Sequence, residues 1–160
     1  MTEDLDALER LTAEREIIAL LQDYCRFADR NENEALAECF TEDCVADYGP
    51  GMGPVRRGRE ARREDAESAL SLFSATSHHL SNFMIEFGDR DSAATSCKLY
   101  AWHRPLGGGP DWELWAEYRD RVVRTAEGWK IASRRFLVAG EANFPAEWEF
   151  LRTERIPGKA

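Results

Sequence analysis

The chain has 160 residues, a formal net charge of −9 at pH 7 and 43% hydrophobic residues. This length and composition predict one soluble globular domain over residues 1–160, with disorder only at the ends. The acidic balance argues against nucleic-acid binding and against docking on an anionic membrane, because both rely on Lys and Arg. No apolar run approaches the length of a membrane span.

The first part of the chain predicts two helices and a strand. Apolar residues recur at helical spacing over residues 3–29, which indicates either one long helix or two segments, the second capped by Thr12. A break rich in turn formers follows, and residues 34–40 predict a short helix. Residues 43–48 predict the first strand, and residues 49–54 form a loop by their Gly and Pro content.

The rest of the chain predicts one helix and four strands. The helix is expected over 59–73, and the arginine-rich stretch 56–65 indicates a solvated face with internal ion pairs rather than a phosphate site. Residues 140–160 form an irregular C-terminal tail, in which residues 145–151 favour a helical turn. The four strands, separated by short turns, are expected at 76–87, 93–104, 112–124 and 129–138.

Short connections between consecutive strands indicate an antiparallel meander. The order of helices, strand, helix and four strands predicts an α+β fold with the helices on one face of the sheet. A strongly curved mixed or antiparallel sheet, with the N-terminal helices closing its concave side, would form a cone with a central pocket. Such a pocket is the usual setting of a small-molecule site.

The cysteines indicate a reducing compartment. No two of them form a C-x-x-C pair, so they are expected to be reduced thiols in the core of a cytoplasmic protein. The N-terminal stretch MTEDLDALERL is acidic and lacks the apolar segment of a signal peptide. The four cysteines are Cys25, Cys39, Cys44 and Cys97.

Histidines are the strongest candidates for chemistry, because the unperturbed pKa of histidine lies near neutral pH. His78 and His79 are adjacent on one predicted strand, and His103 lies on the next. Adjacent strand residues point to opposite faces, so only one of the pair faces a pocket unless a bulge intervenes. The clearest apolar face of this strand, at Phe83, Ile85 and Phe87, has the parity of His79. Either that face packs away from the pocket or a bulge shifts the parity.

Acid–base chemistry by a histidine with a carboxylate is the class that these residues favour. One histidine of the pair, His103 and Asp29 would make a 2-His-1-carboxylate metal set, but nothing in the sequence indicates that they converge, and no metal is expected. No G-x-S-x-G nucleophile elbow and no P-loop is present. Taken alone, Asp29 is an ordinary turn former, and Tyr24 and Tyr48 are ordinary core aromatics.

Six segments in a characteristic order carry a family resemblance: IIALLQDYCRFADR (17–30), FTEDCVADY (40–48), RGREA (57–61), SHHLSNFMIEF (77–87), LYAWH (99–103) and GWKIASRRF (128–136). Over residues 8–140 the chain resembles the SnoaL-like branch of the NTF2-like superfamily. This branch includes scytalone dehydratase, bile acid 7α-dehydratase, hexachlorocyclohexane dehydrochlorinase and SnoaL-type polyketide cyclases. The resemblance implies an NTF2-like cone with a mainly apolar pocket and no cofactor.

The resemblance also implies a His–Asp dyad. In lyases of this family the aspartate follows the N-terminal helix, and the histidine comes just under fifty residues later. By that spacing Asp29 matches the aspartate, and His78 matches the histidine, helped by Asn82 four residues on.

Further site residues follow from the same resemblance. Tyr24 matches a tyrosine of the bile acid dehydratase, whereas Tyr48 and His103 match the tyrosine and second histidine of scytalone dehydratase. Arg135 lies near the position where some members place a substrate-binding arginine. Ala28 departs from the pattern, because scytalone dehydratase has a tyrosine there.

The function implied is a cofactor-independent lyase, with dehydration of a hydrophobic cyclic, polyketide-like or steroid-like substrate as the leading reaction. His78 would be the general acid or base, oriented by Asp29, with His103 as a second proton donor. Tyr24 and Tyr48 would donate to the substrate oxygen. The alternatives are a polyketide cyclase or isomerase, and a non-catalytic binding or assembly module. A homo-oligomer, dimer or trimer, is expected to pack through the outer face of the sheet.

Overall fold

The structure is a computed structural model that describes residues 6–155. Within these residues, six strands form one sheet in the order β2-β1-β6-β5-β4-β3. The elements in chain order are α1 (Ala7–Asp29), α2 (Asn33–Glu38), β1 (Phe40–Asp47), the 3₁₀ turn η1 (Pro50–Met52), β2 (Arg56–Arg57), α3 (Arg59–Leu70), β3 (Phe73–Asp89), β4 (Ser92–Pro105), β5 (Trp112–Thr125) and β6 (Gly128–Ala142).

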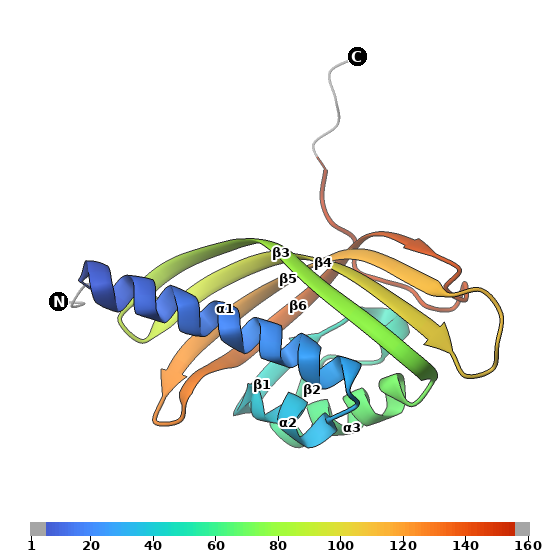
Figure 1. Ribbon diagram of the computed structural model, residues 1–160, viewed down its shortest axis with the longest axis horizontal. Helices are drawn as coiled ribbons and strands as arrows, with labels where there is room; N and C mark the ends of the chain where they lie inside the picture. Colours follow the sequence, from blue (N-terminus) through green and yellow to red (C-terminus); the bar gives the residue numbers. More distant parts are fainter. Residues whose placement is uncertain (1–5, 156–160) are drawn as a thin grey trace, which may run out of the picture.

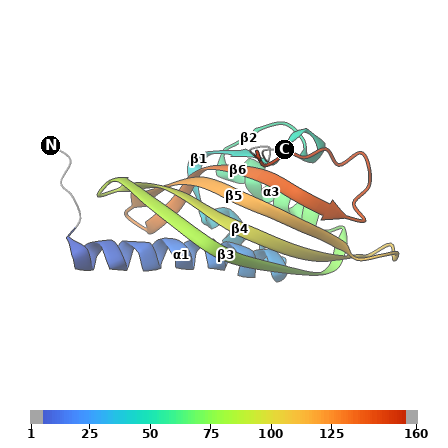
Figure 2. The same ribbon diagram turned by 90° about the horizontal axis from the view of Figure 1, so that it is seen from above.

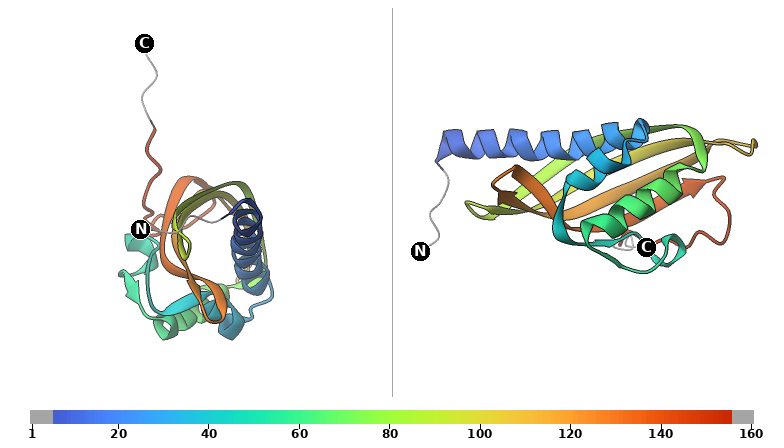
Figure 3. Two further views of the ribbon diagram at one scale, coloured as in Figure 1. Left: turned by 90° about the vertical axis from the view of Figure 1, so that its left-hand side faces the viewer. Right: turned by 90° about the horizontal axis from the view of Figure 1, so that it is seen from below.

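The sheet is mixed and strongly curved. Strands β3 to β6 form the predicted antiparallel meander, whereas β1 pairs with β6 in parallel. Viewed from above, the strands lie side by side in one twisted layer, with α1 along the β3 side (Figure 2). Viewed from the end, the layer curls without closing, and α1 lies against its open side (Figure 3). The predicted α+β class with a curved sheet and covering helices is confirmed.

Helix α1 is one continuous helix rather than two. Its N-terminus is a capping box in which the Asp6 side chain accepts from the backbone of Glu9, and the Glu9 side chain accepts from the backbone of Asp6. Thr12 is not a cap, because its hydroxyl donates to the carbonyl of Leu8 inside the helix. One apolar stripe runs along the helix and faces the sheet: Ala13, Ile17, Leu21, Tyr24, Cys25 and Ala28 are buried.

The β3 strand contains a bulge that decides which histidine faces inward. Ser81 pairs with Lys98 and Met84 with Ser96, so three steps on β3 match two on β4. The additional residue lies beside Asn82, whose φ of 53° is in the left-handed region that Asn tolerates better than most residues. One extra residue reverses the alternation of faces along the strand.

As a result, two sets of residues with opposite parity share the concave face of β3. His78 and Leu80 face inward before the bulge, and Phe83, Ile85 and Phe87 pack against the core after it. His79 is exposed, and its ring packs beside Tyr100 on the other face. The bulge therefore removes the conflict between the apolar alternation and the family spacing.

Other boundaries differ from the predictions for local reasons. Strand β1 begins at Phe40, three residues early, because the backbone N–H of Ile131 already bonds to the carbonyl of Cys39. Helix α3 ends at Leu70, since Phe73 already pairs with Pro105 in the sheet. The two-residue strand β2 was not predicted.

The tail makes one turn, with Trp148 N–H donating to Pro145, and then runs beside β6. Arg152 forms a parallel bridge with Val138, at a part of β6 beyond its pairing with β1.

Helices α2 and α3 pack against one another and against β1, which closes the lower end of the curved sheet (Figure 1). All four cysteines are free and buried, as predicted for reduced core thiols. No helix in the described part of the chain has the length and apolar character that a membrane crossing requires.

One fully buried ion pair lies in the core. Arg134 on β6 donates through Nε and Nη2 to both carboxylate oxygens of Asp120 on β5, at 2.9 and 2.7 Å, and both side chains are 0% exposed. The guanidinium carbon lies 4.2 Å from the ring centre of Tyr24 and 3.8 Å from that of Tyr118. This bidentate pair with its cation–π contacts connects the middle of the sheet to α1.

Candidate active site

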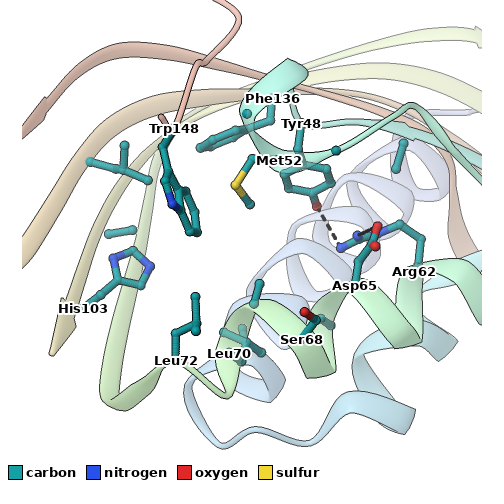
Figure 4. A pocket seen from close by; sticks show the side chains of 18 of the residues that line it. Tyr48, Met52, Arg62, Asp65, Ser68, Leu70, Leu72, His103, Phe136 and Trp148 are labelled. Atoms are coloured by element: carbon teal, nitrogen blue, oxygen red, sulfur yellow. Dashed lines mark hydrogen bonds and ion pairs between the residues drawn. The ribbon is translucent and has the colours of Figure 1, made fainter. Parts of the chain in front are cut away.

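A cavity of about 320 Å³ lies between the concave face of the sheet, α1, α3 and the C-terminal tail. Its volume is within the range of small-molecule sites. Figure 4 shows its aromatic and aliphatic wall, with Trp148, Phe136, Leu70 and Leu72 around the space and His103 at one side. Polar groups enter this mainly apolar lining at two places, one near the two inward histidines and one near Tyr48 and Arg62.

The first polar place is the pair formed by Asp29 and His78. Asp29 is the last residue of α1, and its Oδ1 lies 2.6 Å from Nδ1 of His78 on β3. Its Oδ2 accepts from the backbone N–H of His78 at 3.0 Å, and Oδ1 also accepts from the hydroxyl of Thr76 at 2.9 Å. Burial alone would raise the pKa of Asp29, but the hydrogen bonds from His78 and Thr76 outweigh it and hold this pKa below its ordinary value.

An ionised Asp29 fixes the tautomer of His78. Because the carboxylate only accepts, Nδ1 of His78 carries the hydrogen and Nε2 keeps its lone pair. His78 lines the cavity with a side chain that is 9% exposed. It also borders a second recess, which Asp29, Arg26 and Arg30 line between the end of α1 and β3, so His78 faces both spaces.

His103 lies beside His78 but in a less polar environment. The two rings are perpendicular with their centres 5.3 Å apart, and Phe73 and Phe144 cover His103 at 4.7 and 5.9 Å. Its Nδ1 is buried without a hydrogen-bond partner among the described residues. Burial, and then repulsion from His78, lowers the pKa of His103 from 6.5 to about 4. His103 is therefore neutral at neutral pH, which fits a hydrogen-bonding group better than a cationic acid.

This lowered pKa predicts that His103 destabilises the fold in mild acid. Between pH 6.5 and 4 the unfolded chain binds more protons at this residue than the folded chain, so stability falls as the pH is lowered through this window. The full contribution is about 3 kcal/mol, since each pKa unit corresponds to about 1.4 kcal/mol. Urea unfolding across the window should show a flatter pH dependence for His103→Gln than for the unaltered chain. The exposed His79→Gln is the control, and an equal flattening by both would contradict the prediction.

The second polar place is a chain of hydrogen-bonded side chains from α1, from the loop that follows β1, and from α3. The hydroxyls of Tyr24 on α1 and Tyr48 lie 2.9 Å apart, and Nη2 of Arg62 on α3 donates to the Tyr48 hydroxyl at 3.3 Å (Figure 4). Burial, and then the neighbouring Tyr48, raises the pKa of Tyr24, so this phenol stays protonated. Tyr24 and Tyr48 both line the cavity, and Figure 4 shows Tyr48 on the side away from His103.

Arg62 is a buried, charged residue of the cavity that the sequence analysis did not identify as a site residue. The stretch 56–65 is mostly the expected ion-paired surface, for example between Arg63 and Glu60, but Arg62 is only 4% exposed. Its position four residues before the buried Ala66 is the available sequence signal, because it places Arg62 on the inward face of α3. By contrast, Arg135 is exposed and does not line the cavity, since strand alternation turns Arg134 inward instead.

Four of the six proposed site residues therefore line one cavity, namely Tyr24, Tyr48, His78 and His103, and Asp29 lies behind His78 in the adjoining recess. Asp29 bonds to His78, His103 packs against His78, and Tyr24 bonds to Tyr48, while their catalytic roles stay predictions. No three side chains of His, Cys, Asp or Glu within residues 6–155 are grouped so that they could hold a metal ion.

Comparison with known proteins identifies the family of this fold. A profile of the SnoaL-like domain matches residues 9–135. The chain belongs to the SnoaL-like family. Its structure is similar to that of a candidate scytalone dehydratase from Novosphingobium aromaticivorans, with a TM-score of 0.86, 30% identity, and coverage of 93% of this chain and 98% of that chain.

Two further proteins are similar to this chain, one in sequence and one in fold. The uncharacterised protein Rv2910c of Mycobacterium tuberculosis is 29% identical over 126 residues, which are 74% of this chain and 80% of that protein. A hexachlorocyclohexane dehydrochlorinase, LinA-type3 from Novosphingobium barchaimii, shares the fold at 16% identity with a TM-score of 0.77, over 94% of this chain and 99% of that one. The expected NTF2-like architecture is confirmed.

Proposed function

We propose that this SnoaL-like chain is a cofactor-independent lyase that removes water from a hydrophobic cyclic substrate. The observation that carries the proposal is His78, whose Nδ1 bonds to Asp29 while its ring lines a mainly apolar cavity. A histidine held by a carboxylate is an effective proton-transfer group, and the apolar surroundings favour a ring-containing substrate.

The reaction proceeds from a cyclic ketone with a hydroxyl on the β carbon. Nε2 of His78 takes the proton on the carbon beside the carbonyl, and the electron pair moves onto the carbonyl oxygen as an enolate. Asp29 stabilises the imidazolium, and a phenol of Tyr24 or Tyr48 donates to the enolate oxygen. The enolate then reforms the carbonyl, the carbon–carbon double bond forms, and the β carbon–oxygen bond breaks.

The departing hydroxyl needs one proton to leave as water. The His78 imidazolium supplies the proton that it removed from carbon, so no external acid is required. His103 is neutral and lies beside His78. In this scheme it orients the departing oxygen through a hydrogen bond and does not act as the proton donor. Water and the unsaturated ketone are the two products.

Relatives support an elimination reaction for this cavity. The candidate scytalone dehydratase resembles the chain over almost its whole length, and the dehydrochlorinase shares its fold. A dehydratase and a dehydrochlorinase both remove a small molecule from adjacent carbons. For this chain the substrate class rests on the cavity, because fold alone does not fix an activity.

A panel of β-hydroxy ketones with one to three fused rings tests the proposed lyase. The chain is incubated with each compound in D₂O, and products are analysed by mass spectrometry. The expected product is lighter by one water, with deuterium exchanged into unreacted ketone at the carbon beside the carbonyl. A rearranged product of unchanged mass would overturn dehydration in favour of a cyclase or isomerase. Binding of panel members without turnover or exchange would favour a non-catalytic module.

The homo-oligomer stays a proposal about the outer face of the sheet. Trp115 and Met84 are 45% and 61% exposed there, which leaves apolar surface for a second copy. Of the other tryptophans on β5 and β6, Trp129 is buried against Phe87 and Trp112 packs in an aromatic cluster with Phe144.

A further inference from the structure

Arg62 carries a buried positive charge at the tyrosine end of the cavity. Its Nη1 donates to Asp65 at 3.2 Å and its Nη2 donates to Tyr48, but its Nε is buried without a partner among the described residues. Arginine stays protonated in proteins and only donates, so this end of the cavity holds a permanent hydrogen-bond donor.

The charge of Arg62 is only partly balanced by its neighbours. Asp65 is shared between Arg62 and Arg56, whose Nε lies 2.9 Å from the same carboxylate, so two cations face one anion. Arg134, the other cation near Tyr24, is matched by its own partner Asp120. The polar cluster at this end of the cavity therefore carries about one net positive charge at neutral pH.

The hydrogen-bond chain leaves one phenolic hydrogen for a ligand. Arg62 can only donate, so the Tyr48 oxygen accepts from it. The hydrogen bond between the two tyrosine hydroxyls can then run in either direction. Either Tyr48 donates to Tyr24 and the hydrogen of Tyr24 is free, or Tyr24 donates to Tyr48 and the hydrogen of Tyr48 is free. In both orders the guanidinium polarises the chain and makes the free phenol a stronger donor.

We propose that Arg62, acting through Tyr48, makes this end of the cavity an oxyanion site that prefers the ionised oxygen of a phenol or enol over its neutral form. The inference rests on the proposed function, because the same site would hold the enolate oxygen of the substrate. It adds the source of the charge and the ligand class: a ring system bearing an acidic hydroxyl.

The movement of charge during the proposed reaction explains why a cation at the position of Arg62 would help. Before proton transfer the Asp29–His78 pair carries one negative charge, and the Arg62 cluster carries one positive charge. After transfer the imidazolium balances Asp29, and the enolate oxygen lies beside the positive cluster. The negative charge has moved from one polar place to the other, and each place is then close to neutral. Arg62 is a positioning residue in this scheme, since Tyr24 and Tyr48 contact the ligand.

Binding of substituted 2-naphthols, with naphthalene as the neutral reference, tests the site without a known substrate. Affinities are measured by calorimetry at pH 7, and absorption of the bound probe reports its ionisation. For the unaltered chain, affinity should rise as the pKa of the naphthol falls, and the bound probe should absorb as naphtholate. Arg62→Met should weaken the acidic naphthols about 10- to 100-fold, as expected for a charge-assisted hydrogen bond, and leave naphthalene unchanged.

Two further variants separate the chain of hydrogen bonds from a loss of folding. Tyr48→Phe keeps the buried charge but removes the link, and it should reproduce most of the effect of Arg62→Met. The double variant should lose no more than the larger single loss, because both changes break one chain. Arg63→Met is the matched control on the same helix, since Arg63 pairs with Glu60 and Glu67 at the surface, and it should bind all probes normally.

The result stands apart from the lyase proposal. His78→Ala should retain the preference for acidic naphthols, since it lies at the other polar place. Equal affinity of the unaltered chain for all naphthols would overturn the oxyanion site, as would a preference that persists in both Arg62→Met and Tyr48→Phe. If no compound of the ketone panel is dehydrated but the Arg62-dependent preference remains, the oxyanion site would stand and the lyase proposal would be wrong.

Discussion

Replacement of His78 by Ala should lower kcat by about 10²–10⁴-fold, because the group that moves the proton in both steps is lost. Asp29→Asn should also lower kcat by more than it changes KM, since it removes the charge that stabilises the imidazolium. Turnover of a compound from the β-hydroxy ketone panel measures both effects. Thermal unfolding of the same samples shows whether the fold is retained.

His79→Ala is the matched control for this experiment. It removes the same side chain one position along β3, where the ring lies on the outer face beside Tyr100, and it should turn over the substrate normally. If His79→Ala lost activity and His78→Ala kept it, the catalytic histidine would be His79, on the opposite face of β3, and the proposed dyad would be wrong. Full activity in both variants would show that neither His78 nor His79 is a catalytic residue.

The second large effect concerns stability. Asp120→Asn or Arg134→Met should each lower the free energy of unfolding by about 3–5 kcal/mol, because either change leaves a fully buried charged partner without compensation. Urea unfolding measures the loss. The double variant Asp120→Leu with Arg134→Met should lose less than the worse single variant, since no uncompensated charge remains.

The exposed pair of Arg26 and Asp23 supplies the control for the buried pair. Its side chains are 47% and 50% exposed, so Asp23→Asn should change stability by less than about 1 kcal/mol. A loss for Asp120→Asn as small as that for Asp23→Asn would mean that the buried pair contributes no more than a surface contact. The Arg134 guanidinium also packs against the ring of Tyr24, so its loss should loosen the tyrosine end of the cavity.

Long periodic segments made most of the fold predictable. In α1 and in the four strands of the meander, the apolar pattern continues over enough residues for its period to be recognised from the sequence. Strand β2 has only two residues and no period of its own, and the parallel pairing of β1 with β6 joins parts of the chain far apart in sequence. Neither leaves a local signal.

The site was predictable where spacing carries information and not where packing decides. Asp29 and His78 are 49 residues apart, and the family spacing pointed to their contact. Arg62 was missed because arginine is normally a surface residue, and only the position of α3 against β1 buries it. Arg135 was proposed from the family resemblance, but strand alternation turns its neighbour Arg134 inward, and the partner of Arg134, Asp120, lies on another strand.

The bulge at Asn82 also limits how this chain can vary. Removing one residue there would restore a regular ladder, but the strand could then satisfy only one of its two halves. Keeping Phe83, Ile85 and Phe87 in the core would turn His79 toward the cavity and carry His78 out to solvent. Keeping His78 inward would expose the three apolar side chains. A single irregular residue on β3 thus makes the packing of the core compatible with a histidine that faces Asp29, so deletions at this position would be excluded by either stability or chemistry.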